Sequence, residues 1–459
     1  MRGNSVRKQI LGSVIAIASL IGGMVAPAYG VQPSRSSQTQ KGAEANLIQT
    51  MQSKGTLEPA QAPTMAAGLI VRLANNSSGE KLNSEAGVEA LIEKRIATVE
   101  GQSNLTLGTV ESSDKIVGRT FAVTLEESIP LEDLSGLLRN VRGVRGIAKV
   151  EPDVIFTLDR APLGSPISNS RQTQAAWGLD RIDQKALPLS GNYDYDSDGK
   201  GVLVYVLDTG VRASHADFEG RVLPGRDFVL DGNAADTDCQ GHGTHVAGTV
   251  AGKLYGVAKK ATIVPVRVLD CGGEGQSSWI LDALEWIEED VARHGKPSVV
   301  NMSLGAFEFQ DSYTLAELTI ERLVASGVPV VVASGNGIYV ESIGQNLGVN
   351  ACYVTPARVP GAITVNASNR DDRDAMFSNY GECTDIYAPG VGITSAGIGS
   401  DNSSVAYDGT SMAAPHVAGV IARLLSDGTP GTANFERILS SANPGVIRCL
   451  LYTSDAADE

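Results

Sequence analysis

The sequence feature that most constrains the fold is a series of apolar runs in the second half of the chain. The runs at 202–207, 263–269, 298–303 and 328–333 are rich in valine and other apolar residues, and 363–367 is a shorter fifth run. Runs of this kind are typical of strands that are buried on both faces. They therefore predict a mainly parallel sheet that is covered by helices.

Helical patterns lie between or after these runs, at 277–293, 315–326 and 411–425. Strands that alternate with helices predict a doubly wound α/β domain, which we expect over residues 170–445. In such a domain the ligand site lies at the carboxyl ends of the strands. The motifs described below fall at such an end or in the turn that follows it.

A smaller unit precedes this domain, over residues 67–158. Its pattern of strand, helix, strand, helix, strand predicts a small α+β open sandwich, with two helices on one sheet. The expected strands are 68–73, 118–125 and 150–158, and the expected helices are 87–100 and 131–141.

The two ends of the chain differ from its body. Residues 1–28 are interpreted as a secretory signal peptide, because basic residues precede an apolar stretch and the small residues of Ala26-Pro27-Ala28. Residues 29–66 are expected to form a flexible leader, and 159–169 an exposed processing linker. The last residues, 446–459, have no helical or strand period. We expect them to be a non-native tail after a truncated C-terminus, with a short acidic tail as the alternative.

Composition limits the class of protein. A length of 459 residues suits two or three domains, and a net charge of −15 argues against a nucleic-acid partner or an anionic membrane. No later segment has transmembrane length, so a soluble protein without a membrane anchor is expected. In an oxidising compartment Cys239, Cys271, Cys352 and Cys383 should pair, and three connectivities are open. Cys449 lies in the expected tail.

Three short segments stand out for their chemistry. Asp208 ends a buried strand in Leu-Asp-Thr-Gly, where a carboxylate needs a cationic or hydrogen-bonding partner. His242 opens the run Gly-His-Gly-Thr-His-Val-Ala-Gly at 241–248, and a histidine titrates near neutrality, as a general base should. Ser411 begins an expected helix in Gly-Thr-Ser-Met-Ala-Ala-Pro-His at 409–416, where helix N–H groups can stabilise an oxyanion.

Each segment alone has a simpler explanation. Asp208 could cap a turn, and Ser411 could cap its helix. His242 and His245 could belong to a metallopeptidase site, although their three-residue step and the absence of the Glu depart from the zinc pattern His-Glu-x-x-His. Together, in the order Asp, His, Ser, the segments favour a catalytic triad.

In this order and glycine context, the segments resemble the subtilisin-like serine proteases over about residues 177–440. The resemblance implies that Asp208 orients the imidazole, that His242 is the general base and that Ser411 is the nucleophile. It implies a structural role for His245 and His416. Asn336, in Ala-Ser-Gly-Asn, matches the side chain that stabilises the oxyanion beside the backbone N–H of the nucleophile.

The resemblance also implies how a peptide substrate binds. An extended peptide would pair with two strands and place its P1 side chain in a first specificity pocket. The implied substrate-binding residues are Gly273, Glu274, Gly275, Ser303, Leu304, Gly305, Ala333, Ser334 and Gly335. Residues 303–305 and 333–335 would line this pocket, where small residues favour broad specificity with an apolar or aromatic P1 residue. One segment, 337–350, is longer than the matching family loop, which leaves the shape of the pocket open.

Three runs, 177–183, 239–242 and 268–271, are similar to the proteinase K and aqualysin branch of the family. In that branch the matching cysteines pair as Cys239–Cys271 and Cys352–Cys383. We adopt this pairing as the expectation.

The same branch implies structural Ca²⁺ at one to three sites, and no catalytic metal. The first site would use the backbone oxygens of Pro360 and Ala362 and the carboxylate of Asp385. The second would be formed by Asp180, Asp183, Gln184, Ser190 and Asn192. The run Asp-x-Asp-x-Asp-Gly at 194–199 matches the front half of an EF-hand loop, and either a third site or a solvated acidic turn fits it.

The unit 67–158 resembles the family's inhibitory propeptide, which covers the active site until the enzyme removes it. The expected protein is therefore a secreted, extracellular and monomeric serine endopeptidase, made as an autoprocessed zymogen that acts on proteins and peptides. Its mature start is expected near Ser170. The alternative is a catalytically inactive, subtilase-like binding protein.

Overall fold

The structure of the chain is a computed structural model that describes residues 65–74, 84–102, 107–116, 119–131, 133–157, 175–308 and 314–448. All of these residues belong to one compact unit, Gln61–Glu459. The expected signal peptide 1–28, the processing linker 159–169, the mature start near Ser170 and Cys449 lie outside the described residues.

The centre of the fold is a seven-stranded sheet, in which each pair of neighbouring strands is parallel. Its strands, in spatial order, are β16 (Ile386–Pro389), β15 (Ile363–Ser368), β11 (Val330–Ala333), β9 (Ser298–Met302), β5 (Leu203–Asp208), β7 (Thr262–Arg267) and β6 (Arg226–Asp227). The five predicted apolar runs are all strands of this sheet, so the prediction of a mainly parallel sheet is confirmed. The short edge strands β6 and β16 were not predicted, because neither has a long apolar run.

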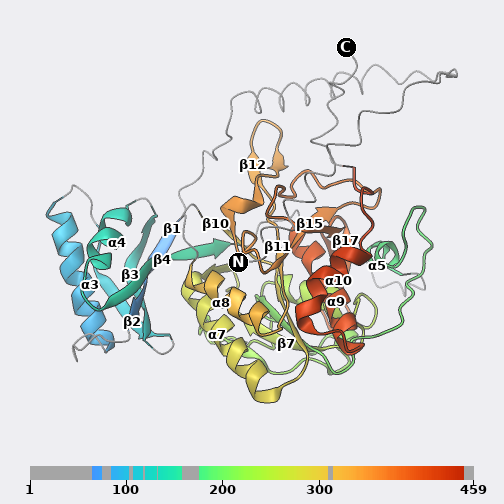
Figure 1. Cartoon of the computed structure of the whole chain (residues 1–459), viewed down its shortest axis with the longest axis horizontal. Helices are drawn as coiled ribbons and strands as arrows, with labels where there is room; N and C mark the ends of the chain where they lie inside the picture. Colours follow the sequence, from blue (N-terminus) through green and yellow to red (C-terminus); the bar gives the residue numbers. More distant parts are fainter. Residues whose placement is uncertain are drawn as a thin grey trace, which may run out of the picture. The chain divides into compact units, whose positions relative to one another are not determined.

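Helices cover both faces of the sheet, as Figure 1 shows. Helix α6 (His242–Ala251) and helix α9 (Thr410–Ser426) pack in one apolar core with valines of β5 and β11. Helix α7 (Ser277–His294) and helix α8 (Leu315–Ala325) pack in a second core on the other face. These two cores confirm the doubly wound α/β prediction.

Shorter elements complete the larger domain. They are α5 (Trp177–Ile182), β8 (Glu274–Gln276), β10 (Ala306–Phe307), β12 (Ile338–Val340), β13 (Gln345–Leu347), β14 (Val354–Thr355), β17 (Ile393–Ala396), β18 (Ser404–Tyr407), α10 (Asn434–Ser441) and the 3₁₀ turns Ala216–Phe218, Ala351–Tyr353 and Gly431–Ala433. Strand β10 pairs with β14, β12 with β13, and β17 with β18, each antiparallel.

The N-terminal domain is an antiparallel sheet with two helices. Its elements are β1 (Met65–Leu73), α3 (Glu85–Glu100), β2 (Val110–Lys115), β3 (Thr120–Pro130), α4 (Ser135–Arg142) and β4 (Ile147–Thr157), and the strand order is β2-β3-β1-β4. The prediction of three strands missed β2, because its sequence Val-Glu-Ser-Ser-Asp-Lys has little apolar content. Strand β1 also begins inside the expected leader 29–66, where Met65 pairs with Pro130.

The described part of the chain ends with a backbone contact in the expected tail 446–459. The N–H of Arg448 donates to the carbonyl oxygen of Asp372 at 2.8 Å, and its guanidinium donates to the carbonyl oxygen of Asp371 at 2.9 Å. Arg448 is thus packed on the larger domain. Among the described residues, we find no helix with the length and apolar character needed to cross a bilayer.

Candidate active site

The candidate residues gather at the carboxyl edge of three neighbouring strands. Asp208 is the last residue of β5, Ser303 follows β9, and Asn336 comes three residues after β11. Strand β9 pairs with both β5 and β11, and all three run parallel. Because parallel strands end at the same edge, this topology brings side chains from distant parts of the sequence together.

Asp208 and His242 form a buried pair. Nδ1 of His242 lies 2.8 Å from Oδ1 and 2.9 Å from Oδ2 of Asp208. Asp208 is fully buried. The N–H of Thr209 also donates to Oδ1 of Asp208 at 2.8 Å. Since the carboxylate meets Nδ1, a neutral imidazole carries its proton there and leaves Nε2 as the basic nitrogen.

A glycine allows this close approach between helix α6 and strand β5. A Cβ added to Gly243 would lie 2.1 Å from the carbonyl oxygen of Gly210 and 3.0 Å from Cβ of Asp208. Any larger residue would therefore force the first turn of α6 away from the end of β5.

A second carboxylate, Asp238, organises the first turn of α6. Its Oδ1 accepts the N–H of Gly241 at 2.8 Å, and its Oδ2 accepts the N–H of Thr244 at 2.9 Å. The hydroxyl of Thr209 donates to Asp238 at 3.0 Å and accepts the N–H of Gly243 at 3.0 Å. Burial raises the pKa of Asp238. Asp238 was not predicted, although an acidic residue a few positions before a helix is a capping signal.

Ser411 stands in the first turn of α9, and this helix packs against α6. The Ser411 hydroxyl donates to the carbonyl oxygen of Ser303 at 3.1 Å. In return, the hydroxyl of Ser303 donates to the carbonyl oxygen of Ser411 at 2.9 Å. The side-chain amide of Asn301 donates to the Ser303 hydroxyl at 2.9 Å, so the start of α9 is fastened to the end of β9.

Asn336 is held against the start of the same helix. Its Oδ1 accepts the N–H of Thr410 at 2.7 Å and the Thr410 hydroxyl at 2.9 Å. This orients the amide, because the oxygen faces Thr410 and the amino group lies on the opposite side. The hydroxyl of Thr410 also accepts the N–H of Gly335 at 3.2 Å.

The two other histidines of the motifs have different partners from His242. Nε2 of His245 lies 2.8 Å from the carbonyl oxygen of Ile393, and Nδ1 of His416 lies 2.8 Å from that of Met412. Burial lowers the pKa of His245 to about 3 and that of His416 to about 4. His242 and His245 therefore do not converge, and the described residues contain no group of three or more His, Cys, Asp or Glu side chains that could hold a metal ion.

The two segments that should line the specificity pocket, 303–305 and 333–335, both lie beside the side chain of Val354. A Cβ added to Gly305 would lie 3.1 Å from Cγ1 of Val354, and one added to Gly335 would lie 3.6 Å from the same atom. The side-chain amide of Asn379 donates to the carbonyl oxygen of Ser334 at 2.7 Å. Val354 and Asn379 were not predicted, because no local motif marks them.

The other expected substrate strand is already paired within the chain. Strand β8, which contains Glu274 and Gly275 and follows Gly273, pairs antiparallel with β4 of the N-terminal domain. Two acidic residues of β4 reach helix N-termini beside it. Asp153 accepts the N–H of Ser278 at 2.9 Å and its hydroxyl at 2.6 Å, at the start of α7. Glu151 accepts the N–H of Leu315 at 3.0 Å, at the start of α8.

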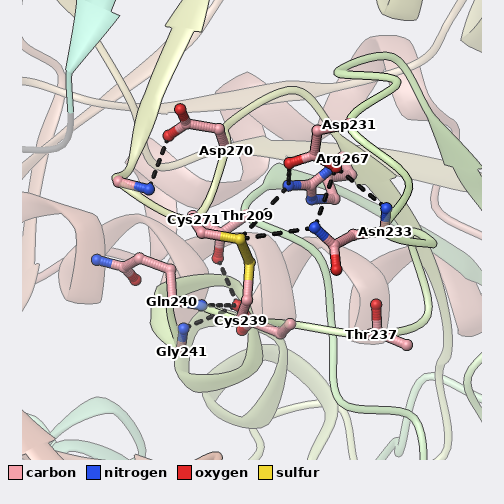
Figure 2. The surroundings of a disulfide bond; sticks show 12 residues. Thr209, Asp231, Asn233, Thr237, Cys239, Gln240, Gly241, Arg267, Asp270 and Cys271 are labelled. Atoms are coloured by element: carbon pink, nitrogen blue, oxygen red, sulfur yellow. Dashed lines mark hydrogen bonds and ion pairs between the residues drawn. A yellow bond between two sulfur atoms is a disulfide. The ribbon is translucent and has the colours of Figure 1, made fainter.

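The chain has the two disulfides that the resemblance implies, Cys239–Cys271 and Cys352–Cys383. The first links the loop before α6 to the segment before β8, and Figure 2 shows it beside Thr209, Gln240 and Gly241.

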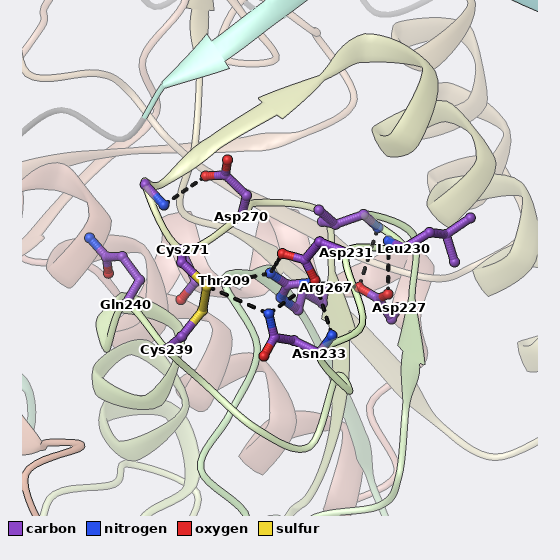
Figure 3. Close-up of polar contacts among 12 residues, drawn as sticks. Thr209, Asp227, Leu230, Asp231, Asn233, Cys239, Gln240, Arg267, Asp270 and Cys271 are labelled. Carbon is purple, nitrogen blue, oxygen red and sulfur yellow. Dashed lines mark hydrogen bonds and ion pairs between the residues drawn. A yellow bond between two sulfur atoms is a disulfide. The ribbon is translucent and has the colours of Figure 1, made fainter. Parts of the chain in front are cut away.

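A buried arginine supports the same segment. The guanidinium of Arg267 pairs with Asp231 at 2.7 Å and with Asp227 at 3.0 Å, and its Nη2 lies 4.0 Å from Sγ of Cys271 (Figure 3). The side chains at this rim of the site are therefore fixed by both a covalent bond and ion pairs.

Of the residues expected to bind Ca²⁺, Asp180 lies in α5 and the others lie in loops. Asp180 accepts the N–H and the hydroxyl of Ser190, both at 3.0 Å, and Gln184 Oε1 accepts the same N–H at 3.1 Å. Asn192 donates its N–H to the Ser190 hydroxyl at 3.1 Å, and Asp183 accepts the N–H of Asp194. Four of these five expected ligands thus belong to one hydrogen-bond network around Ser190, whereas Asp183 is bonded to Asp194.

The acidic charges in this region repel one another. Burial, and then the neighbouring charges of Asp180 and Asp194, raise the pKa of Asp183. In the run 194–199, by contrast, Asp196 pairs with Arg423 at 2.7 Å, which favours the solvated acidic turn over a third ion. At the first expected site, Oδ2 of Asp385 accepts the N–H of Thr364 at 2.9 Å, two residues after Ala362.

Comparison with known proteins gives a consistent result. The model of a family described as the subtilase family matches residues 199–454. The chain is 45% identical over 293 residues to an extracellular serine proteinase of a Thermus species, and the aligned region covers 61% of this chain and 67% of that protein. It is 43% identical over 316 residues to the alkaline serine exoprotease A of Vibrio alginolyticus, and the aligned region covers 69% of this chain and 53% of that protein.

A solved structure supports the same assignment. A cold adapted subtilisin-like serine proteinase matches with a TM-score of 0.54 and 42% sequence identity, over 60% of this chain and 94% of that chain. The sequence is therefore similar to that of an extracellular serine proteinase, and the fold to that of a subtilisin-like serine proteinase.

Proposed function

The chain belongs to the subtilase family of serine endopeptidases, and from this membership we propose that Asp208, His242 and Ser411 are its catalytic triad. In this mechanism His242 takes the proton of the Ser411 hydroxyl as its oxygen attacks a peptide carbonyl. Asp208 holds the imidazole in the required tautomer and stabilises the imidazolium that forms. His242 then returns the proton to the leaving amine, and water repeats the sequence on the acyl-enzyme.

The observation that carries the proposal is the double contact of His242 Nδ1 with both carboxylate oxygens of Asp208, at 2.8 and 2.9 Å. A turn-capping aspartate would not need an imidazole, and a zinc site would need further ligands beside His242, which the described residues do not bring together. In a buried pair this contact has a large effect on the imidazolium, because little water screens it.

We assign oxyanion stabilisation to Asn336 and the N-terminus of α9. The amide oxygen of Asn336 is engaged by Thr410, so its amino group is the part that can donate to an oxyanion. The N–H groups of the first turn of α9 and the positive end of the helix dipole act on the same charge. Removing one such donor typically lowers kcat by about 10²–10³-fold.

We propose that substrates bind as extended peptides along Gly273–Gly275 and Ser303–Gly305. The P1 side chain would enter between Ser303–Gly305 and Ala333–Gly335, where small residues leave space and Val354 limits the depth. This geometry supports broad specificity with apolar or aromatic P1 residues.

We further propose that the N-terminal domain is an inhibitory propeptide. Its strand β4 occupies the edge of β8 that a substrate would use, and Asp153 and Glu151 cap the helices on either side of the contact. A chain in this state is a zymogen, which Ser411 would activate by cutting the segment that follows β4. The mature N-terminus is still expected near Ser170.

Structural Ca²⁺ is proposed at two places. Residues 180–192 would supply Asp180, Asp183, Gln184, Ser190 and Asn192, and a divalent cation there would relieve the repulsion that acts on Asp183. The backbone oxygens of Pro360 and Ala362 with Asp385 would form the other site. Neither ion would take part in the reaction, and both would stiffen loops.

The place of action is proposed from the relatives. Extracellular serine proteinases among them, the expected signal peptide 1–28 and the two disulfides support a secreted enzyme that acts on proteins as a monomer.

The proposal is tested by labelling the matured protein with a fluorophosphonate, which reacts with an activated serine. We expect one label per molecule in the wild type and none in Ser411→Ala. The variant should also accumulate as the uncut precursor. A wild type without label, or a label that persists in Ser411→Ala, would contradict the triad and favour the inactive binding protein.

A further inference from the structure

Strand β8 carries an acidic side chain at the edge where a peptide pairs. The strand reads Glu274-Gly275-Gln276, and of these residues Glu274 is exposed, Gly275 is buried and Gln276 is half-buried. Within the described part of the chain, no Lys, Arg or His side chain forms an ion pair with Glu274. Its carboxylate is therefore available to a charged group on a bound peptide.

The turn before β8 fixes the backbone of Glu274. Oδ1 of Asp270 accepts the N–H of Gly272 at 2.8 Å and the N–H of Glu274 at 2.9 Å. The N–H of Asp270 donates to the carbonyl oxygen of Glu274 at 2.8 Å. The Cys239–Cys271 disulfide holds the same turn, and Figure 2 shows Asp270 beside it. Glu274 is thus in place before a substrate arrives, and Asp270 adds a second negative charge to the turn.

The N-terminal domain shows which position of a paired strand meets Glu274. In the antiparallel pairing of β4 with β8, Phe156 lies opposite Gly275 and Thr157 lies opposite Glu274. Phe156 is 5% exposed and belongs to the same apolar core as Leu304, so the position opposite Gly275 faces the protein. Because successive positions of a strand face opposite sides, the position opposite Glu274 faces outward, on the same side as the glutamate.

A substrate that pairs with β8 in the same way brings one of its side chains next to this carboxylate. Directly opposed residues of an antiparallel pair have their Cβ atoms about 5 Å apart, which lysine and arginine side chains span easily. Opposite charges at such positions stabilise the pairing, and like charges weaken it. Since Glu274 is exposed, the attraction is modest and is screened by salt.

We infer that Glu274 is a specificity-determining residue, which favours lysine or arginine at the substrate position opposite it and disfavours aspartate or glutamate there. This inference rests on the proposed endopeptidase function and on the proposed binding of extended peptides along β8. It is separate from the P1 preference, because the P1 pocket lies between 303–305 and 333–335. The favoured substrates are thus peptides with a basic residue at one position on the N-terminal side of P1.

The test uses fluorogenic peptides with phenylalanine fixed at P1 and with lysine, glutamine or glutamate placed in turn at each position from P2 to P5. At one of these positions we expect the wild type to have a kcat/KM about two- to fivefold higher for lysine than for glutamine, and lower again for glutamate. The difference should lie mainly in KM, because the ion pair forms equally in the ground state and the transition state. Glu274→Gln should bring the ratio of lysine to glutamine close to one, and Glu274→Lys should reverse the order. Ratios are compared because Glu274 also pairs with the peptide through its backbone.

Glu289→Gln is the matched control, because it removes the same charge from an exposed residue in the C-terminal half of α7 and should keep the wild-type ratio. Raising the ionic strength from about 0.02 M to about 0.5 M should shrink the preference. The inference is overturned by a wild type without a lysine preference at any scanned position, or by a preference that persists in Glu274→Gln or at high salt. Failure of the proposed function has a different signature, since the wild type would then cleave none of the peptides and would not take the fluorophosphonate label.

Discussion

Replacing Gly243 by alanine should separate the proposed general base from its partner. The new Cβ would lie 2.1 Å from the carbonyl oxygen of Gly210, whereas ordinary contacts of a Cβ begin at 3.4 Å. The atom it meets is backbone, so the first turn of α6 has to move by about 1 Å, and His242 begins that turn. A misplacement of this size costs about 10²-fold in rate, equivalent to ~2.7 kcal/mol of transition-state stabilisation.

The assay is kcat and KM of the matured variant, with active sites counted by titration. The variant precursor can be processed by a trace of tagged wild-type enzyme, which is then removed. We expect kcat to fall on the order of 10²-fold and KM to change little, because the substrate strands are untouched. Gly431→Ala is the control, since its Cβ would meet the carbonyl oxygen of Gly327 at 1.7 Å, away from the site, and should lower stability alone. A Gly243→Ala enzyme that keeps more than about a tenth of the wild-type kcat would refute the reasoning.

Three further predictions concern stability and release. Cys271→Ser and Cys383→Ser should each lower the free energy of unfolding by about 4 kcal/mol, because the disulfides join residues 32 and 31 positions apart. Calorimetry of the inhibitor-blocked enzyme measures this loss, and unequal or negligible losses would contradict the prediction. Burial raises the pKa of Asp153 from 3.8 to about 6, so its contribution to holding the N-terminal domain is complete below 3.8 and is lost as pH rises through about 6. The lag before precursor activity appears should therefore shorten between pH of about 5 and about 7, and Asp153→Asn should abolish this dependence; an unchanged slope would contradict it. Burial lowers the pKa values of His245 and His416 from 6.5 to about 3 and 4, so the unfolded chain binds more protons and stability should fall as pH drops below 6.5; a flat melting temperature from 6.5 to 4 would contradict this.

The sequence predicted those parts of the fold that depend on local chemistry. The five apolar runs became strands because burial on both faces requires continuous apolar residues. Asp208, His242 and Asn336 could be selected because each follows a strand or opens a helix in a recognisable glycine context. Helix α8 begins at Leu315 with a capping box from Thr314 and Glu317, which is also a local signal.

The parts that could not be predicted depend on contacts between distant segments. Val354 and Asn379 line the proposed pocket only because β14 and the loop after β15 come to lie beside Gly305, Ser334 and Gly335. Neither residue has a distinctive neighbour in the sequence. Strand β2 is polar, so only its pairing with β3 makes it a strand. Asp238 accepts hydrogen bonds from five groups, on Thr209 after β5, in the turn before α6 and on Thr244 in its first turn. Its contact with Thr209, 29 positions away, has no local signal in the sequence.

The positions of the two disulfides follow from how the proposed cleft is built. Its walls are loops after parallel strands, and loops gain less from the packed cores than helices and strands do. Cys271 lies two residues before Gly273, Cys352 two before Val354, and Cys239 three before His242. Each bond therefore ends next to a segment that a substrate or the general base would use. The apolar cores pack on the sheet, so the disulfides act on loops that the cores do not reach. Loss of the Cys239–Cys271 bond in Cys271→Ser should therefore reduce activity even at temperatures below the unfolding transition of the variant.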